Sequence, residues 1–494
     1  MSCAQMSRAD SWTIQNGFAS GYQLMLEAGA AIAGRAMQEF AGAATIHVLC
    51  GPGNNGGDGY VAATKLAAVG VPIRIYALGA PRAGSDAAIA RNDCPVNAEV
   101  FPEFSPEPRD LVIDAVFGAG LTRELPVDVV TAFTIAREAR CRVIAVDLPS
   151  GLNGDSGFDL GGTLQADVTV TFFRKKPGHL LYPGRALCGE IFVADIGVRD
   201  GVFEGEPPSI FENQPVLWAG WLPDNADRQH KYTRGHVGVF SGPRLASGAS
   251  RLAALSAQAV GPGAVTILGR PSALDIQAAH VTSIMLAVAE AGDGAAKLRA
   301  LKGCSAAVIG PGFRDLREAA SIIVSHLANN RERPIPLVVD ADGITALARQ
   351  PETFFEAAAG SAPSLALTPH EGEFARLFPD LAAAEGMAKH ERALAAAKTA
   401  NAIVVYKGPD TVIAAPDGRV AINANAPPAL ATAGSGDVLS GLIAGLAARR
   451  MPLWEAACAA VWLHGESGAA AGPLAIAEDL VPASRMALES LLSR

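Results

Sequence analysis

The sequence predicts two consecutive α/β domains, each built on a mostly parallel β-sheet. Short, continuous apolar runs rich in β-branched residues alternate with helical patterns along most of the 494 residues. Such continuous runs are typical of strands that are buried on both faces of a sheet. The alternation breaks between residues 200 and 236, where Gly, Pro and polar residues dominate. We therefore expect a first domain at residues 1–211 and a second at 212–494.

The first domain contains six expected strands separated by helical segments. They begin at residues 44, 71, 110, 141, 167 and 190 and read ATIHVLC, VPIRIYAL, DLVIDAVFG, CRVIAVDLPSG, DVTVTFF and EIFVADIG. Because helices separate them, the strands predict a Rossmann-like, three-layer α/β/α domain.

The second domain repeats this alternation with seven expected strands. They begin at residues 236, 263, 306, 336, 364, 402 and 410 and read HVGVFSG, GAVTILG, AAVIGPG, PLVVDADG, SLALTP, AIVVYKG and DTVIAAPDGRVAI. An Ala-rich helical region follows from Asp437. The second domain is therefore also predicted to be α/β.

Composition narrows the class of protein. Half of the residues are hydrophobic and 18% are charged, which provides enough apolar surface for two cores. The net charge of −9 disfavours a nucleic-acid-binding surface. The seven cysteines are scattered without CxxC spacing, which argues against a disulfide framework or a zinc site. Without an apolar leader or a long apolar segment, we expect a soluble, cytoplasmic protein that does not bind membranes.

The loop GPGNNGGDGY at residues 51–60 follows the first expected strand. Its glycine spacing matches the dinucleotide-binding fingerprint, which predicts an acidic residue about 20 residues further on, at the end of the next strand. That strand carries no such residue at its end. The fingerprint also leaves Asn54, Asn55 and Asp58 unexplained, so a loop built for a different purpose is the competing interpretation.

Polar side chains end other strands of this domain. Asp114 ends the third expected strand, and Asp147 and Ser150 follow the fourth. Because the carboxyl ends of parallel strands meet at one edge of a sheet, these residues and Asn55 are expected to converge. Oxygen ligands with one or two carboxylates suit a hard cation. The alternative is that each Asp or Ser only caps the following helix or turn.

Six segments in order resemble the NAD(P)H-hydrate epimerase domain over about residues 1–210: AQMSRAD, GNNGGDGYVAA, VIDAVFGAGLTRE, VIAVDLPSGLNGDSG, KKPGHLLYPG and VADIGV. The resemblance implies a K⁺ ion held by Asn55, Asp114 and Ser150. It also implies a substrate that is a nicotinamide dinucleotide hydrated on the ring carbon next to nitrogen. The implied substrate contacts are Asn54, Asn55, Gly56, Gly57, Asp58, Gly118, Ala119, Gly120, Leu121, Thr122, Arg123, Glu124 and Asp147. Inverting that carbon needs proton transfer at its hydroxyl, and Asp147 is the candidate general acid/base.

In the second domain, ATAGSGDVLSGLIAGL at residues 431–446 places a Gly-rich turn before a helix. Backbone N–H groups at a helix N-terminus form an anion site that suits a transferring phosphoryl group. Asp437 beside it can accept a proton from an attacking hydroxyl. The competing interpretation is an ordinary helix start, with an Asp favoured by the helix dipole.

The accompanying segments favour the first interpretation. GVFSGPRLASGASRLAALSAQAVGPGAVTI, VIGPGF, LVVDADG, LALTPHEGEFARL and VVYKGPDTVIAAPDG resemble the ADP-dependent NAD(P)H-hydrate dehydratase, which has a ribokinase-like fold, over about residues 225–490. The resemblance implies contacts with the hydrated substrate from Ala249, Gly312, His370 and Asp437. The implied ADP contacts are Lys407, Gly408, Pro409, Asp410 and Thr411, with Pro427, Pro428, Ala429, Leu430, Ala431, Thr432, Ala433, Gly434, Ser435 and Gly436 closing on the phosphates. A Mg²⁺ ion bridging the phosphates is expected on general grounds, but its protein ligands are not evident from the sequence. Asp340 and Asp342 could be linked to a metal, although their place in DADG favours turn residues.

Together, the two resemblances predict a bifunctional nicotinamide-nucleotide repair enzyme. One domain would interconvert the R- and S-forms of NADHX or NADPHX, the hydrated cofactors. The other would dehydrate the S-form with ADP, releasing AMP and phosphate, and the chain is expected to form a homo-oligomer. The alternatives are a small-molecule kinase related to vitamin and sugar kinases, and a first domain that serves only as a non-catalytic nucleotide-binding module.

Overall fold

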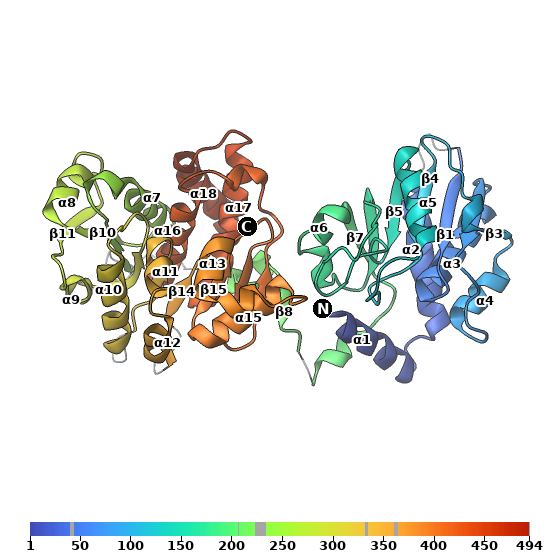
Figure 1. The fold of residues 1–494 in the computed structure, drawn as a ribbon, viewed down its shortest axis with the longest axis horizontal. Helices are drawn as coiled ribbons and strands as arrows, with labels where there is room; N and C mark the ends of the chain where they lie inside the picture. The colour runs from blue at the N-terminus through green and yellow to red at the C-terminus, as the bar shows by residue number, and fades with distance from the viewer. Residues whose placement is uncertain (40–43, 206, 223–233, 331–333, 360–363, 494) are drawn as a thin grey trace. The chain divides into compact units, whose positions relative to one another are not determined.

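The computed structural model describes residues 1–39, 44–205, 207–222, 234–330, 334–359 and 364–493. The chain divides into two compact units, Met1–Ile210 and Phe211–Arg494, and Figure 1 shows both. Within the described residues, no helix combines the length and apolar character that crossing a membrane requires.

The first unit is built on a seven-stranded sheet in the order β3-β2-β1-β4-β5-β6-β7, in which every neighbouring pair is parallel. The strands are β1 (Ile46–Cys50), β2 (Ile73–Ala77), β3 (Ala98–Val100), β4 (Leu111–Ala115), β5 (Arg142–Val146), β6 (Val168–Phe172) and β7 (Glu190–Ala194). The six expected strands are all present. The additional strand, β3, has only three residues and no apolar run that would reveal it.

Helices cover both faces of this sheet. They are α1 (Cys3–Gln15), α2 (Gly21–Glu39), α3 (Asn54–Ala68), α4 (Asp86–Asp93), α5 (Val127–Glu138) and α6 (Gly184–Leu187). Val48 belongs to the core layer that includes α2 and α3, whereas its neighbour Leu49 belongs to the layer that includes α5. Because both faces are buried, the strands read as continuous apolar runs. The predicted α/β class is confirmed.

The second unit carries a ten-stranded sheet in the order β11-β10-β9-β12-β13-β14-β15-β16-β17-β8. Its strands are β8 (Ile210–Glu212), β9 (His236–Phe240), β10 (Ala264–Gly269), β11 (Met285–Val288), β12 (Cys304–Ile309), β13 (Leu337–Val339), β14 (Leu365–Leu367), β15 (Ile403–Tyr406), β16 (Val412–Ala414) and β17 (Val420–Ile422). The strands from β11 to β15 are parallel, and β15, β16 and β17 pair antiparallel. The last expected strand is therefore a hairpin of two.

The helices of the second unit also cover both faces of its sheet (Figure 1). They are α7 (Ser247–Ala259), α8 (Pro271–Ala278), α9 (Gly294–Ala300), α10 (Leu316–Ala328), α11 (Asp342–Leu347), α12 (Pro351–Ala359), α13 (Glu371–Leu377), α14 (Pro379–Ala382), α15 (Lys389–Ala400), α16 (Ser435–Ala448), α17 (Leu453–Ala471) and α18 (Ala477–Leu492). Helix α16 is buried along nearly its whole length and packs against α7 and α17. This is the α/β architecture predicted for the second domain, and it places the start of α16 near Asp340 and Lys407, which follow β13 and β15.

Candidate active sites

In the first unit, the glycines of the loop between β1 and α3 allow the backbone to pack closely. The Gly51 amide donates to the Ala115 carbonyl at 3.0 Å, and a side chain at Gly51 would collide with the Val116 carbonyl. A side chain at Gly56 would in turn collide with the Gly51 carbonyl. These two glycines of the fingerprint therefore allow β1, β4 and α3 to pack closely together. The polar residues of the loop remain available to bind a ligand.

A cavity of about 650 Å³ opens beside this loop. Most of the predicted epimerase substrate contacts line it: Asn54, Asn55, Asp58, Gly118, Ala119, Gly120, Leu121, Thr122, Arg123 and Asp147. Gly56, Gly57 and Glu124, all within the described part of the chain, are not among the lining residues. Asp10 of α1, Met25 of α2 and Lys176 also line the cavity, and none of these three was among the predicted substrate contacts.

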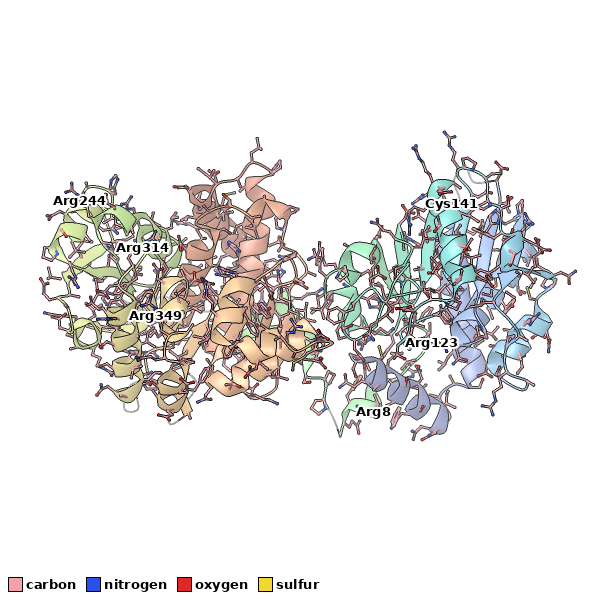
Figure 2. The ribbon with its side chains drawn as sticks, viewed as in Figure 1. Arg8, Arg123, Cys141, Arg244, Arg314 and Arg349 are labelled. Carbon is pink, nitrogen blue, oxygen red and sulfur yellow. The ribbon has the colours of Figure 1, made fainter. Side chains whose placement is uncertain are left out.

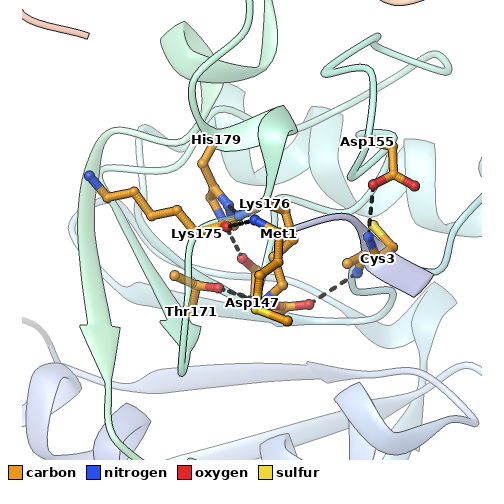
Figure 3. Close-up of polar contacts among 9 residues, drawn as sticks. Met1, Cys3, Asp147, Asp155, Thr171, Lys175, Lys176 and His179 are labelled. Atoms are coloured by element: carbon orange, nitrogen blue, oxygen red, sulfur yellow. Dashed lines mark hydrogen bonds and ion pairs between the residues drawn. The ribbon is translucent and has the colours of Figure 1, made fainter. Parts of the chain in front are cut away.

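Asp147 lies immediately after β5, with its backbone in the left-handed region at φ 65°. Its Oδ1 atom accepts hydrogen bonds from Lys176 Nζ at 2.5 Å and from Thr171 Oγ1 at 2.9 Å (Figure 3). Its Oδ2 atom accepts from the Ala119 amide at 3.2 Å. Burial favours the neutral acid, but the positive charge and hydrogen bond of Lys176 outweigh it and lower the pKa of Asp147. This carboxylate is therefore ionised.

His179 fixes the backbone of Asp147. The Lys176 amide donates to His179 Nδ1 at 2.9 Å, so Nε2 carries the ring hydrogen and donates to the Asp147 carbonyl at 2.7 Å. Burial, with a further contribution from Lys176, lowers the pKa of His179 to about 4. The imidazole is therefore neutral at physiological pH and acts as a positioning residue.

The pKa values of two further carboxyl groups in the cavity are raised. Burial, reinforced by the negative charge of Asp147, raises the pKa of Asp58 well above its ordinary value. Burial also raises the pKa of Asp10 to about 6. In this cavity the pKa of Asp147 is therefore lowered, whereas that of the neighbouring Asp58 is raised. Such a separation of pKa values is characteristic of acid/base pairs.

The three residues predicted to hold K⁺ lie around the segment that follows β4. Ser150 Oγ is 2.6 Å from Asp114 Oδ1 and 3.0 Å from the Phe117 carbonyl, and it accepts from the Phe117 amide at 2.8 Å. One hydroxyl hydrogen serves only one of those two acceptors, so this cluster has more oxygen acceptors than hydrogens. Asn55 lies across the same segment, since a side chain at Gly118 would be 2.9 Å from Asn55 Oδ1. Its Nδ2 atom is buried without a hydrogen-bond partner among the described residues.

This oxygen-rich cluster fits a monovalent cation. Asp114 is fully buried, and burial raises its pKa to about 6 although Ser150 hydrogen-bonds to it. A cation beside it would stabilise the ionised form. The donors are carboxylate, hydroxyl and amide oxygens, which hard cations prefer.

In the second unit, Asp437 lies in the first turn of α16. Gly434 precedes the helix with φ 88°, a left-handed conformation that favours glycine. Burial, reinforced by the charge of Asp340, raises the pKa of Asp437 to about 7. Asp437 is thus suited to accept a proton near neutral pH, at a helix N-terminus where the Ser435 amide donates to the Thr432 carbonyl at 3.3 Å.

Lys407 stands beside this helix start but is paired with another carboxylate. Its Nζ atom is 2.8 Å from Asp340 Oδ1 and 4.0 Å from Glu373 Oε2. A side chain at Gly436 would lie 3.3 Å from the same Nζ atom. Burial opposes the charge of Lys407, but Asp340 and Glu373 outweigh that effect and raise its pKa. Lys407, predicted to contact ADP, therefore lies against the predicted anion site.

The other predicted nucleotide contacts have structural partners. Asp410 Oδ1 binds Lys389 Nζ at 2.5 Å, and Thr411 Oγ1 donates to the Gly408 carbonyl at 2.8 Å. These contacts shape the turn after β15 that carries Lys407. Ser435 is 3.0 Å from His464 Nε2, and burial lowers the pKa of that histidine to about 4.

The predicted contacts with the hydrated substrate lie at two places. A side chain at Gly312 would be 3.2 Å from Ala249 Cβ, so these two residues form one wall. His370 caps α13, with Nδ1 accepting from the Gly372 amide at 3.0 Å, and its Nε2 atom is 3.5 Å from Glu373 Oε1. Glu373 therefore connects His370 to Lys407 and the region around Asp437.

Two family models match the chain. Residues 237–482 match the model described as NAD(P)H-hydrate dehydratase, and residues 21–178 match the model described as YjeF-related protein N-terminus. The Thermofilum pendens protein described as bifunctional NAD(P)H-hydrate repair enzyme Nnr is 35% identical, over 90% of this chain and 86% of its own length. The chain belongs to the family of bifunctional NAD(P)H-hydrate repair enzymes.

Other members of this repair-enzyme family are similar over comparable lengths. The Coxiella burnetii member is 32% identical over 98% of both chains, and the Escherichia coli member is 30% identical over 90% of this chain and 84% of its own. Among solved structures, the ADP/ATP-dependent NAD(P)H-hydrate dehydratase from Bacillus subtilis, co-crystallized with ATP/Mg²⁺, covers 57% of this chain and 98% of its own at 25% identity and a TM-score of 0.49. Family membership confirms the predicted NAD(P)H-hydrate epimerase and dehydratase activities. It disfavours a kinase fused to a non-catalytic module.

Proposed function

We propose that residues 1–211 epimerise hydrated NAD(P)H with Asp58 and Asp147 as a general acid/base pair. The observation that carries this assignment is that the pKa values of two carboxyl groups in one cavity are shifted in opposite directions, that of Asp147 downward and that of Asp58 upward. The ring nitrogen pushes out the hydroxyl of the neighbouring carbon while Asp58 gives that oxygen its proton, and water leaves. Water then returns to the opposite face and gives a proton to Asp147. Proton exchange between the two carboxyl groups restores the starting state.

Asn55, Asp114 and Ser150 would hold a K⁺ ion beside this cavity. Such an ion supplies positive charge that orders the segment after β4. That segment also presents the Ala119 amide to Asp147. In this proposal the cation supports the substrate wall and takes no part in proton transfer.

We propose that residues 212–494 dehydrate the S-form at the expense of ADP. Asp437 accepts the proton of the ring hydroxyl while its oxygen attacks the terminal phosphorus of ADP, and AMP leaves. The amides of Gly434, Ser435 and Gly436 would stabilise the transferring phosphoryl group. The carbon–oxygen bond then breaks, phosphate departs, and the adjacent carbon loses a proton to restore the double bond of NAD(P)H.

Magnesium is expected to enter with the nucleotide. Within the described ranges, no three or more His, Cys, Asp or Glu side chains form a group suited to a metal ion. Asp340 Oδ1 is engaged by Lys407, and Asp342 Oδ2 accepts from the Arg314 amide at 3.0 Å. Mg²⁺ is commonly held largely by substrate phosphates and water, with few protein ligands, and that arrangement fits this site.

Two further properties complete the proposal. The seven cysteines, all within the described residues, form no disulfide, which agrees with work in a reducing cytoplasm. We also expect self-association into a homo-oligomer, which sedimentation velocity at several protein concentrations would test. A single species of monomer mass at every concentration would contradict that expectation.

The decisive experiment supplies a defined mixture of R and S hydrates of NADH with ADP, or with ATP, and follows the return of NADH absorbance. We expect complete recovery with ADP, because the first domain converts the R-form into the dehydratase substrate. Asp147→Asn should limit recovery to the S fraction. Recovery only with ATP would contradict the ADP assignment, and turnover of a vitamin alcohol without recovery would favour the kinase alternative.

A further inference from the structure

A second cavity, of about 690 Å³, lies in the second unit at the carboxyl ends of β9, β10 and β12. Four arginines line it: Arg270, Arg314, Arg317 and Arg349. Asp315 and Glu318 are the two acidic residues in the lining, so four positive charges face two negative ones. This excess of positive charge is notable in a chain whose net charge is −9.

Arg270 forms an ion pair with each of the two acidic residues in the lining. Arg270 Nη2 is 2.8 Å from Glu318 Oε2 and 3.9 Å from Asp315 Oδ2. Asp315 also accepts from the Glu318 amide at the start of α10. Arg314, Arg317 and Arg349 are exposed, and within the described ranges their guanidinium groups have no ion pair. Three guanidinium groups are thus available to an anion in solution.

The cavity adjoins the predicted dehydratase site. Gly242 and Phe313 line it, and Gly242 packs so closely on Gly312 that a side chain there would collide with the Gly312 carbonyl. Gly312 in turn forms the wall with Ala249 that is expected to contact the hydrated ring. The arginine cavity and the nicotinamide wall are therefore neighbours.

Asp342 connects the cavity to the catalytic centre as well. Arg314 adopts a left-handed conformation at φ 66°, and its amide donates to Asp342 Oδ2 at 3.0 Å. The charge of Asp342 also contributes to raising the pKa of Asp437. Figure 2 labels Arg314 and Arg349 together with Arg244, which immediately follows the lining residue Pro243. These arginines come from three separate segments, after β9, after β12 and after α11.

We propose that this cavity binds phosphate groups of the dinucleotide substrate while its hydrated ring lies against Gly312 and Asp437. The inference rests on the proposed dehydratase function and adds the means by which the enzyme recognises a dinucleotide. Guanidinium groups bind phosphate through paired, charge-assisted hydrogen bonds, so three of them suit a group with about two negative charges. ADP is assigned to a different place, the turn at Lys407 and the loop before α16. The phosphate bound by the arginines is either the diphosphate bridge or the 2′-phosphate of the NADP form.

The test compares wild type with Arg314→Gln, Arg317→Gln, Arg349→Gln and the triple variant in steady-state dehydration. We expect KM for the hydrated dinucleotide to rise about tenfold in each single variant and about a hundredfold in the triple variant. The values of kcat and of KM for ADP should change little. Arg485→Gln is the matched control, because Arg485 is an exposed arginine of the same unit that lies outside the cavity and pairs with Glu489.

A comparison of KM for hydrated NADH and for hydrated NADPH shows which phosphate of the dinucleotide the cavity binds. A rise of KM for hydrated NADPH alone would assign the cavity to the 2′-phosphate, whereas an equal rise for hydrated NADH would assign it to the diphosphate. Unchanged KM for both, or a rise only in KM for ADP, would overturn the inference. Wild-type protein that fails to restore NADH would instead overturn the proposed dehydratase function, so the two failures are distinguishable.

Discussion

Each domain places a lysine close to an aspartate that is expected to move protons, but the two pairings differ. In the first domain, Lys176 bonds to the catalytic carboxylate itself, with Nζ 2.5 Å from Asp147 Oδ1. In the second domain, Lys407 bonds to Asp340 at 2.8 Å, and Asp340 adds its charge to the surroundings of Asp437. The pKa of Asp147 is consequently lowered, whereas that of Asp437 is raised to about 7.

This difference shows how the partner of the lysine determines the chemistry of the aspartate. Burial alone would raise the pKa of both carboxyl groups, so burial does not explain why their pKa values differ. A directly bonded lysine keeps Asp147 ionised, and Asp58 then has to supply the proton for the departing hydroxyl. Because Lys407 bonds to Asp340 and not to Asp437, Asp437 is a stronger base than Asp147. It is therefore suited to removing a proton from a poorly acidic hydroxyl.

The largest expected effect comes from Asp437→Asn. Removal of the general base should lower kcat for dehydration by about a thousandfold, within the range typical of acid–base catalysis. Epimerisation, measured by exchange between the R and S hydrates, should remain at the wild-type rate. A dehydration rate within tenfold of wild type would contradict the assignment.

Stability provides the control for this variant. Between pH 3.8 and about 7 the folded state keeps the Asp437 proton that the unfolded state releases, so the free energy of unfolding falls over this range and this loss is complete above about pH 7. Asp437→Asn removes that ionisation. Its thermal unfolding midpoint at pH 8 should therefore equal or exceed that of wild type.

Asp58→Asn should lower epimerisation about a hundredfold, because the amide supplies no acidic proton to the departing hydroxyl. Asn has nearly the shape of the protonated Asp58 side chain, so the fold should be retained. Epimer exchange measures the loss, and dehydration of pure S hydrate by the same variant provides the internal control. Unchanged epimer exchange would leave Asp147 acting without this partner.

Lys176→Met should make Asp147 resemble Asp437. Without the lysine, the largest effect that opposes burial is lost and the pKa of Asp147 rises, so epimerisation should fall about tenfold at neutral pH. The low-pH limb of the rate should also move to higher pH, an effect that a purely structural role of Lys176 does not predict. The matched control is Lys175→Gln, since Figure 3 shows the Lys175 side chain pointing away from Asp147.

Much of both sites could be predicted because parallel strands present their carboxyl ends at one edge. The sequence marks Asp114, Asp147 and Ser150 as strand-end residues, and the order β1-β4-β5 brings their segments to Asn55. The role of Lys176 could not be read in this way. It follows β6, and its contact with Asp147 depends on β6 lying next to β5 and on the fold of the loop after it. The motif KKPGH contains this lysine but does not show which carboxylate it meets.

The arginine cavity could not be predicted from the sequence, also because its residues meet only in the folded chain. Arg314 and Arg317 lie together at the start of α10, but Arg349 follows α11, so no local pattern connects all three. Exposed arginines are also usual on protein surfaces. The neighbouring positions of β12 and β13 in the sheet bring the two segments that carry these arginines to one cavity.

The smallest expected effect concerns Asp342, whose charge helps raise the pKa of Asp437. Asp342→Asn preserves an oxygen that can accept from the Arg314 amide but removes the charge. The pKa of Asp437 should therefore fall, and the acidic limb of dehydration, near pH 7 in wild type, should move down by a fraction of a pH unit. At pH 8, where Asp437 is ionised in both proteins, kcat should change little. Asp275→Asn, an exposed charge removed from α8, should leave the limb in place; a limb that moves equally in both variants would show that net charge, rather than the neighbourhood of Asp437, sets its basicity.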